Sequence, residues 1–190
     1  MLYNNDKVGV SMVYEKRTVI SKEKLDELVN YFDNKAAVSA TEKQVIYNYH
    51  TEEDLRLIRT NKYVKLDLKS YNGENNKVYI TKSQEKDLIE MLFKIGINVD
   101  FKRFRIRHQY MYDNYYISID ENIKTGNIFR VKVTYEEDDK LKEVKENVKN
   151  LLLSLDIEDT PLDQFQKIYG KYRSDWADLT KDIDEDDFLK

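Results

Sequence analysis

The sequence predicts an α+β protein with a closed or strongly curved antiparallel sheet of about eight strands. Polar and apolar residues alternate along many short segments, which is typical of strands because successive side chains point to opposite faces. Several other segments carry apolar residues at helical spacing, and such helices need an apolar surface to cover. The 190 residues, 41% of them hydrophobic, favour a single domain with its own core.

The predicted strands are short, regular and separated by turns or helices. In chain order they are residues 7–20, 44–49, 54–60, 63–69, 76–81, 102–110, 114–121 and 127–136. Only one proline, Pro161, and five glycines are present, so no flexible linker is visible.

Helices are predicted between these strands and after them. Ser21 can cap a first helix, and Thr81 with Gln84 resembles a capping box that opens a second one ending near Gly96. A charged helix with an apolar side is expected over residues 138–154, and Pro161 favours the start of a last one. We expect one domain over residues 1–180 and an acidic, frayed tail over 181–190.

Two of the strands carry cations on one face and apolar side chains on the other. In 103–107, three arginines alternate with Phe104 and Ile106. In 128–135, Arg130 and Lys132 alternate with apolar residues in the same way. The net charge of the chain is −4, so a concentrated cationic face suggests an anionic ligand more than general attraction to nucleic acid.

Alternation alone leaves two arrangements open. In the first, the polar faces meet solvent and the apolar faces line an ordinary core. In the second, the sheet curls with its polar faces inward and helices cover its apolar outside.

Several segments match motifs of one known family in the same order. Residues 44–49 read Q-V-I-Y-N-Y, 57–59 read L-I-R, 66–69 read L-D-L-K and 119–126 read I-D-E-N-I-K-T-G. Their order and spacing resemble the CYTH superfamily, also called triphosphate tunnel enzymes, which includes class IV adenylate cyclases, thiamine triphosphatases and RNA triphosphatases. The resemblance implies a CYTH-like domain: an antiparallel eight-stranded, tunnel-like β-barrel with helices packed outside.

The resemblance also implies that the polar faces line a lumen holding a triphosphate among arginines and lysines. The match of 57–59 to the family's L-R-x-R segment adds Arg59 to the expected phosphate-binding residues. The others are Arg17, Lys65, Lys69, Arg103, Arg105, Arg107, Arg130 and Lys132, with Lys77 on the same lumen face.

The metal-binding signature of the family is broken. The pattern E-x-E-x-K aligns with residues 13–17, V-Y-E-K-R, which retain only Glu15. Arg130 and Lys132 stand where the family has a second carboxylate pair. Glu15 and Asp120 are the remaining candidate metal ligands, and Glu15 is the one candidate general base. Cations in place of carboxylates favour anion binding over metal-dependent hydrolysis.

Three functions follow as hypotheses. The first is a catalytically degenerate tunnel protein that binds a nucleotide, a polyphosphate or the 5′ triphosphate of RNA. The second is an active triphosphatase or nucleotidyl cyclase, which would require Mg²⁺ or Mn²⁺. The third is a scaffold that keeps only the fold and contacts a protein partner in a larger assembly.

Composition limits the setting of the protein. Cysteine is absent, which excludes disulfides and thiolate metal ligands. No run approaches the ~18 apolar residues of a membrane span, and the first six residues lack the pattern of a signal peptide. We therefore expect an intracellular, cytoplasmic protein with no membrane partner.

Overall fold

The computed structural model describes residues 12–70 and 75–190, so the part of the first predicted strand before Met12 lies outside the described residues. Its elements, in chain order, are β1 (Met12–Ile20), α1 (Lys22–Lys35), β2 (Val38–Tyr49), β3 (Asp54–Arg59), β4 (Val64–Lys69), β5 (Asn75–Ile80), α2 (Lys82–Lys94), β6 (Val99–Tyr112), β7 (Tyr115–Asn122), β8 (Asn127–Tyr135), a 3-10 turn (Asp138–Lys140), α3 (Leu141–Ser154), α4 (Leu162–Thr180) and α5 (Glu185–Leu189).

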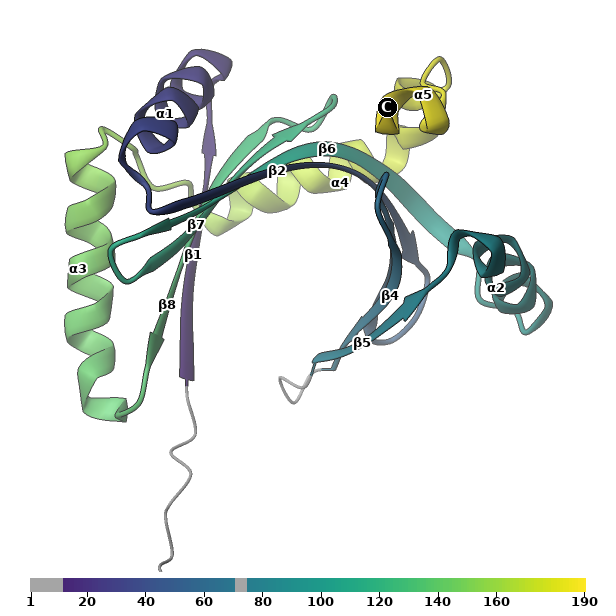
Figure 1. The fold of residues 1–190 in the computed structure, drawn as a ribbon, viewed down its shortest axis with the longest axis horizontal. Coiled ribbons are helices and arrows are strands. Elements are labelled where there is room, and N and C mark those ends of the chain that lie inside the picture. The colour runs from purple at the N-terminus through teal and green to yellow at the C-terminus, as the bar shows by residue number, and fades with distance from the viewer. Residues whose placement is uncertain (1–11, 71–74) are drawn as a thin grey trace, which may run out of the picture.

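All eight strands join one antiparallel sheet in the order β1-β8-β7-β6-β2-β3-β4-β5. The predicted class and strand number are confirmed. The predicted closure is wrong, because β1 and β5 are the two ends of the sheet and do not pair within the described residues. The sheet forms an arch, as Figure 1 shows, in which β2 and β6 make the roof and the other strands make two walls.

The long strands β2 and β6 connect the two walls. They pair from Val38 with Met111 to Tyr49 with Val99, and the register shifts between Asn48 and Tyr49. Such an irregularity increases the local twist and bend of a strand. One continuous pair of strands therefore takes part in both walls, and the arch is a single unit.

The inward and outward faces of the arch follow the predicted alternation. The apolar positions of the strands point outward and form two cores under separate helices. One core packs α1 and α3 on β6, β7 and β8 around Phe32, Phe129 and Val148. The other packs α2 and α5 on β2, β3 and β4 around Val45, Leu57 and Leu92. The curled arrangement is therefore the observed one, with polar faces inside the arch.

The helix starts are set by local hydrogen bonds. The Ser21 side chain accepts from the Lys24 amide at the start of α1, and Thr81 with Gln84 forms the predicted capping box of α2. Gly96, with φ of +86°, follows the end of α2, where a left-handed residue suits glycine. These caps fix where the two helices leave the sheet.

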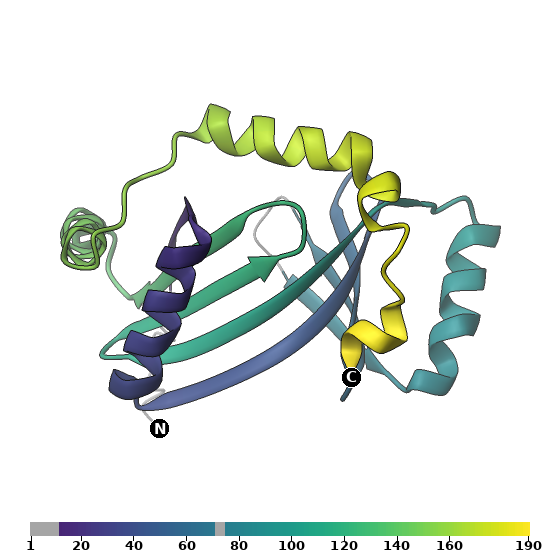
Figure 2. The ribbon, with the colours of Figure 1, turned by 90° about the horizontal axis from the view of Figure 1, so that it is seen from above.

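Helix α4 crosses one end of the concave side. Tyr172 is buried there and donates a hydrogen bond to the Lys102 carbonyl of β6. Seen from above, α4 runs along one side of the arch and links α3 to α5 (Figure 2). It therefore partly covers the end of the arch where β6 begins.

The last residues differ from the expected frayed tail. Residues 185–189 form α5, in which Leu189 is buried and Phe188 packs edge-on against Phe104. Glu185 also pairs with Lys102 at 2.7 Å. Phe188 and Leu189 hold this otherwise acidic segment on the convex face.

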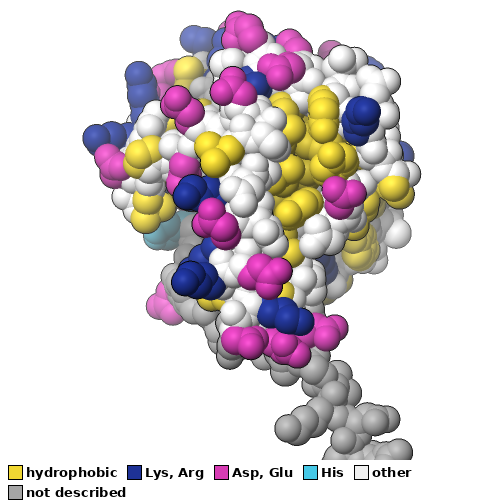
Figure 3. All heavy atoms as spheres, turned by 90° about the vertical axis from the view of Figure 1, so that its left-hand side faces the viewer, with side chains coloured by type: hydrophobic (Ala, Val, Ile, Leu, Met, Phe, Trp, Pro, Cys, Tyr) yellow, Lys and Arg dark blue, Asp and Glu magenta, His cyan; other side chains and the backbone are white. Residues whose placement is uncertain are grey.

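The outer surface mixes charge with apolar patches. Figure 3 shows a group of hydrophobic side chains among scattered charges on the side where α3 lies. Among the helices of the described residues, none combines the length and apolarity that a membrane crossing requires.

Candidate phosphate-binding trough

The concave side of the arch is a basic trough. It encloses about 610 Å³. Eight of its lining residues are cations: Arg56, Lys65, Lys69, Lys77, Arg105, Arg107, Arg130 and Lys132. Glu42 and Asp67 are the two acids among the lining residues. The trough is therefore a concentrated positive surface in an acidic protein.

The floor of the trough is organised by one buried carboxylate, Asp120. Its Oδ1 accepts from Arg107 Nε at 2.6 Å, and its Oδ2 accepts from Arg107 Nη2 at 2.7 Å and Arg105 Nη1 at 3.2 Å. Arg130 Nη2 lies 3.7 Å from the same oxygen. Burial would raise the pKa of Asp120, but Arg105 and Arg107 outweigh it and hold the pKa well below its usual range. Asp120 is thus a fixed anion that positions three arginines.

Glu15 plays a similar part on the β1–β8 wall. It pairs with Lys132 at 3.0 Å and with its strand neighbour Arg17, and Arg130 Nε lies 3.8 Å away. Burial would raise the pKa of Glu15, but Arg130, Arg17 and Lys132 lower it from 4.5 to about 2. Glu15 therefore stays ionised and engaged at neutral pH.

The β3–β5 wall carries lysines that form no ion pair with an acid among the described residues. Arg56 pairs with Asp67 at 3.3 Å. Lys65, Lys69 and Lys77 make no ion pair with any acid of residues 12–70 and 75–190. Burial lowers the pKa of Lys69, and Arg56 and Lys132 lower it further. The cations of the two walls thus repel one another across the trough, which is a physical reason for the sheet to stay open.

Two tyrosines form a rim at one end of this wall. Tyr63 and Tyr79 meet edge to face, with ring centroids 5.5 Å apart, and Lys65 Nζ lies 5.7 Å from the Tyr63 ring centroid. Tyr79 is 63% exposed. The sequence contains many tyrosines, and only strand register identifies this pair as part of the trough.

The structure brings most of the predicted phosphate-binding residues together. Six of them line the trough. Arg17 lies on β1, on the same strand face as Glu15, with which it pairs. Arg103 lies under α4, where it donates to Tyr169 Oη at 3.1 Å and to Asn48 Oδ1 at 3.2 Å. The six are Lys65, Lys69, Arg105, Arg107, Arg130 and Lys132.

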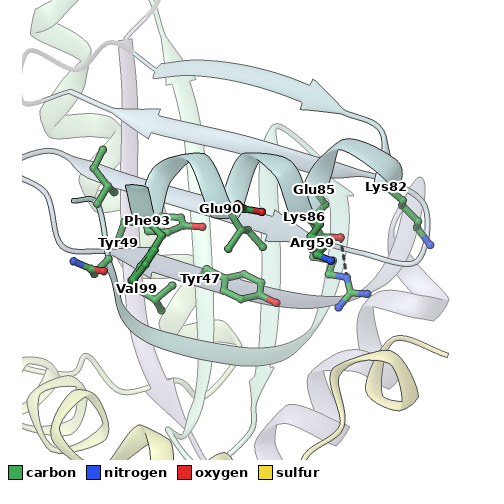
Figure 4. A pocket seen from close by; sticks show the side chains of 12 residues that line it. Tyr47, Tyr49, Arg59, Lys82, Glu85, Lys86, Glu90, Phe93 and Val99 are labelled. Atoms are coloured by element: carbon green, nitrogen blue, oxygen red, sulfur yellow. Dashed lines mark ion pairs between the residues drawn. The ribbon is translucent and has the colours of Figure 1, made fainter. Parts of the chain in front are cut away.

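The predicted position of Arg59 is wrong. Arg59 points to the convex face, where its Nε lies 3.3 Å from Glu85 (Figure 4). Its Nη1 lies 3.2 Å from Glu185. Residues three apart on a strand face opposite sides, so Arg56 is the one that reaches the trough. The register of β3 against β4 runs without a bulge through both residues.

The two candidate metal ligands predicted from the sequence, Glu15 and Asp120, do not fit a divalent metal. Such an ion needs several free oxygen ligands. Both oxygens of Asp120 accept from arginines, and Glu15 pairs with Lys132 and Arg17. Across the described ranges, no group of three or more His, Cys, Asp or Glu side chains could hold a metal ion.

Comparison with known proteins finds relatives by structure only. No family model and no curated protein sequence matches the chain. A predicted adenylate cyclase from Vibrio parahaemolyticus is 13% identical, with a TM-score of 0.59 over 82% of this chain and 97% of that one. A predicted adenylyl cyclase from Hippeastrum, with a dominant triphosphatase activity, is 14% identical, with a TM-score of 0.58 over 84% and 96%. A chain of the Schizosaccharomyces pombe Mediator head module is 10% identical, with a TM-score of 0.52 over 76% and 94%.

These likenesses define the class of the protein at the level of the fold. The chain has the CYTH, or triphosphate tunnel, fold, as the sequence motifs indicated. In this chain the sheet is an open arch, and the expected tunnel is a trough with one long open side.

Proposed function

We propose that the trough binds a polyanion that carries several linked phosphates, without metal-dependent hydrolysis. Nucleotides, polyphosphate and the 5′-triphosphorylated end of RNA share this chemistry. The observation that carries the proposal is a set of three lysines, Lys65, Lys69 and Lys77, that form no ion pair with an acid in the described part of the chain. They face arginines held in place by Asp120 and Glu15.

The two kinds of cation have different parts in this proposal. Guanidinium groups fixed by carboxylates present planar donors to phosphate oxygens with little loss of side-chain freedom. The lysines of the opposite wall supply mobile charges that close on the ligand. A bound polyanion relieves the repulsion between the walls, so binding also stabilises the fold.

The missing metal site argues against the hydrolytic alternative. A triphosphatase or cyclase uses divalent ions to neutralise phosphate charge and orient the nucleophile. Here cations occupy the corresponding strand positions, and Glu15, with a pKa of about 2, is a weak base. Because the Hippeastrum protein has triphosphatase activity, the experiment below also measures hydrolysis.

The test is calorimetric titration with tripolyphosphate, ATP and 5′-triphosphorylated RNA, each in EDTA and again in Mg²⁺ or Mn²⁺. We expect binding in EDTA, and no phosphate or pyrophosphate release in either metal. Ligand at 100 times its Kd stabilises by about 2.7 kcal/mol, so the melting temperature should rise by roughly 5–10 °C.

Matched variants locate the binding. Lys69→Glu reverses a charge in the trough, whereas Lys149→Glu makes the same change on the exposed surface of α3. Only the first should weaken binding. Turnover that requires Mg²⁺ and disappears in Glu15→Gln would replace the proposal with the enzymatic one.

A scaffold function has one observation in its favour, the likeness to a chain of the Mediator head module. If none of the three ligands binds in either buffer, the phosphate proposal fails. A protein complex that Lys69→Glu disrupts would then support the scaffold function.

A further inference from the structure

A second cleft lies on the convex face of the sheet, outside the trough, between α2 and strands β2 and β6. It encloses about 600 Å³, within the roughly 300–1,000 Å³ of small-molecule pockets. Figure 4 shows α2 along the cleft, with Lys82 and Arg59 at one end and Tyr49 and Phe93 at the other. The cleft is lined by Tyr47, Tyr49, Arg59, Lys82, Glu85, Lys86, Ile89, Glu90, Phe93, Ile97, Asn98 and Val99.

The part of the cleft away from Lys82 and Arg59 is largely apolar. Ile89 and Phe93 from α2, Val99 from β6 and the ring of Tyr47 from β2 contribute this surface. Phe93 is 68% exposed although it belongs to the lining. An aromatic ring left in water beside other apolar side chains is typical of a binding surface.

One buried hydroxyl in the lining has no partner. Tyr49 is 6% exposed, and its Oη finds no hydrogen-bond partner in the described part of the chain. Tyr47, on the same strand face, donates its hydroxyl proton to Glu185. A buried hydroxyl without a hydrogen-bond partner is unfavourable, and a ligand oxygen that accepts from it would remove that cost. Burial and Glu85 raise the pKa of Tyr49 to about 12, so the group remains a donor at neutral pH.

The charges at the rim favour an anion. The two acids of the lining are already paired, Glu85 with Arg59 at 3.3 Å and Glu90 with Lys94 at 2.7 Å. Lys82 and Lys86 lie one turn apart on α2 and have no acidic partner among residues 12–70 and 75–190. The unpaired charge of the cleft is therefore positive and lies at one end of an apolar surface.

We propose that this cleft binds a small amphipathic anion. Its apolar body lies between Phe93 and Val99, an oxygen within that body accepts from Tyr49 Oη, and its carboxylate or sulfonate lies at Lys82 and Lys86. At a rise of 1.5 Å per residue, the seven steps from Lys86 to Phe93 span about 10 Å, which sets the length of the body.

The test uses the full chain and the fluorescent amphipathic anion dansylglycine, in which a sulfonamide, whose oxygens can accept a hydrogen bond, joins an aromatic body to a carboxylate. We expect saturable one-site binding that persists in excess tripolyphosphate, because the trough is a separate site. Val99→Phe, which fills the cleft, should raise the Kd at least tenfold. Val38→Phe, an exposed position on β2 outside the cleft, should leave it unchanged. Tyr49→Phe should weaken binding without lowering the melting temperature of the free protein.

A charge-reversal pair keeps the test decisive if a cleft-filling variant folds poorly. Lys82→Glu/Lys86→Glu should raise the Kd several-fold at low salt, and Lys145→Glu/Lys149→Glu, at the same spacing on α3, should not. The proposal is overturned if the probe does not bind, or if tripolyphosphate displaces it. It is also overturned if the two double variants bind the probe with the same Kd.

Discussion

The substitution Asp120→Asn tests how the trough holds its arginines. The carboxylate is 1% exposed and lies within 4 Å of Arg105, Arg107 and Arg130. Replacing it keeps the shape of the side chain but leaves buried guanidinium groups without their counter-charge. Breaking a buried ion pair in this way costs about 3–5 kcal/mol. For a domain of this size, the melting temperature should fall by roughly 6–20 °C.

The assay is urea unfolding at neutral pH, repeated with saturating tripolyphosphate. Because Asp120→Asn adds net positive charge to the trough, the polyanion should stabilise the variant more than the wild type. Glu121→Gln is the matched control, since that acid pairs with Lys22 at the surface and its loss should cost less than about 1 kcal/mol. If Asp120→Asn unfolds within 1 kcal/mol of the wild type, Asp120 does not organise the arginines as argued.

Three further predictions concern the trough. Lys69→Glu should raise the Kd for tripolyphosphate at least about tenfold at low salt and less in high salt, with Lys149→Glu within twofold of wild type; calorimetry checks this. Because the pKa of Glu15 is lowered from 4.5 to about 2, its contribution to stability is complete above pH 4.5 and is lost as the pH falls towards 2. The difference in unfolding free energy between wild type and Glu15→Gln should therefore shrink over that range, and a constant difference in urea titrations would contradict this. If the exposed ring of Tyr79 stacks on a base, Tyr79→Ala should weaken the binding of ATP by about 1–3 kcal/mol and leave the binding of tripolyphosphate unchanged. Equal effects on the two affinities, measured by calorimetry, would exclude stacking.

Strand alternation made the inner face of the arch predictable. The arginines at 103, 105 and 107 share a face because strand side chains alternate, and the same rule places Lys65, Lys69 and Lys132. Local pattern is sufficient here because the strand register runs without a shift through each of these positions. That these residues bind phosphate stays a prediction.

Arg59 shows where motif matching fails. The sequence offers two arginines three residues apart, and only one can face inward. Leu55 and Leu57 are buried on the outer face of β3, the face that also carries Arg59. Because side chains alternate along a strand, these apolar neighbours indicate that Arg56 is the inward residue. The family motif outweighed that local signal.

Closure of the sheet and the fate of the C-terminus depend on contacts far apart in the chain. β1 and β5 are the two ends of the sheet, and the cations that face one another between them come from strands far apart in the chain, such as Lys69 on β4 and Lys132 on β8. The acidic run before Leu189 suggests a solvated tail, yet Phe188 and Leu189 find an apolar surface on β2 and β6. Neither outcome can be read from residue spacing alone.

Because β1 and β5 do not pair in the described structure, the route by which a ligand can enter the trough differs from that of a closed barrel. A closed barrel admits a chain molecule only by one end, whereas an open sheet can also accept an internal stretch of it from the side. If the trough binds polyphosphate as proposed, a long or cyclic polyphosphate needs no free end to enter it. Affinity should then follow the charge density along the ligand and not the presence of a terminus.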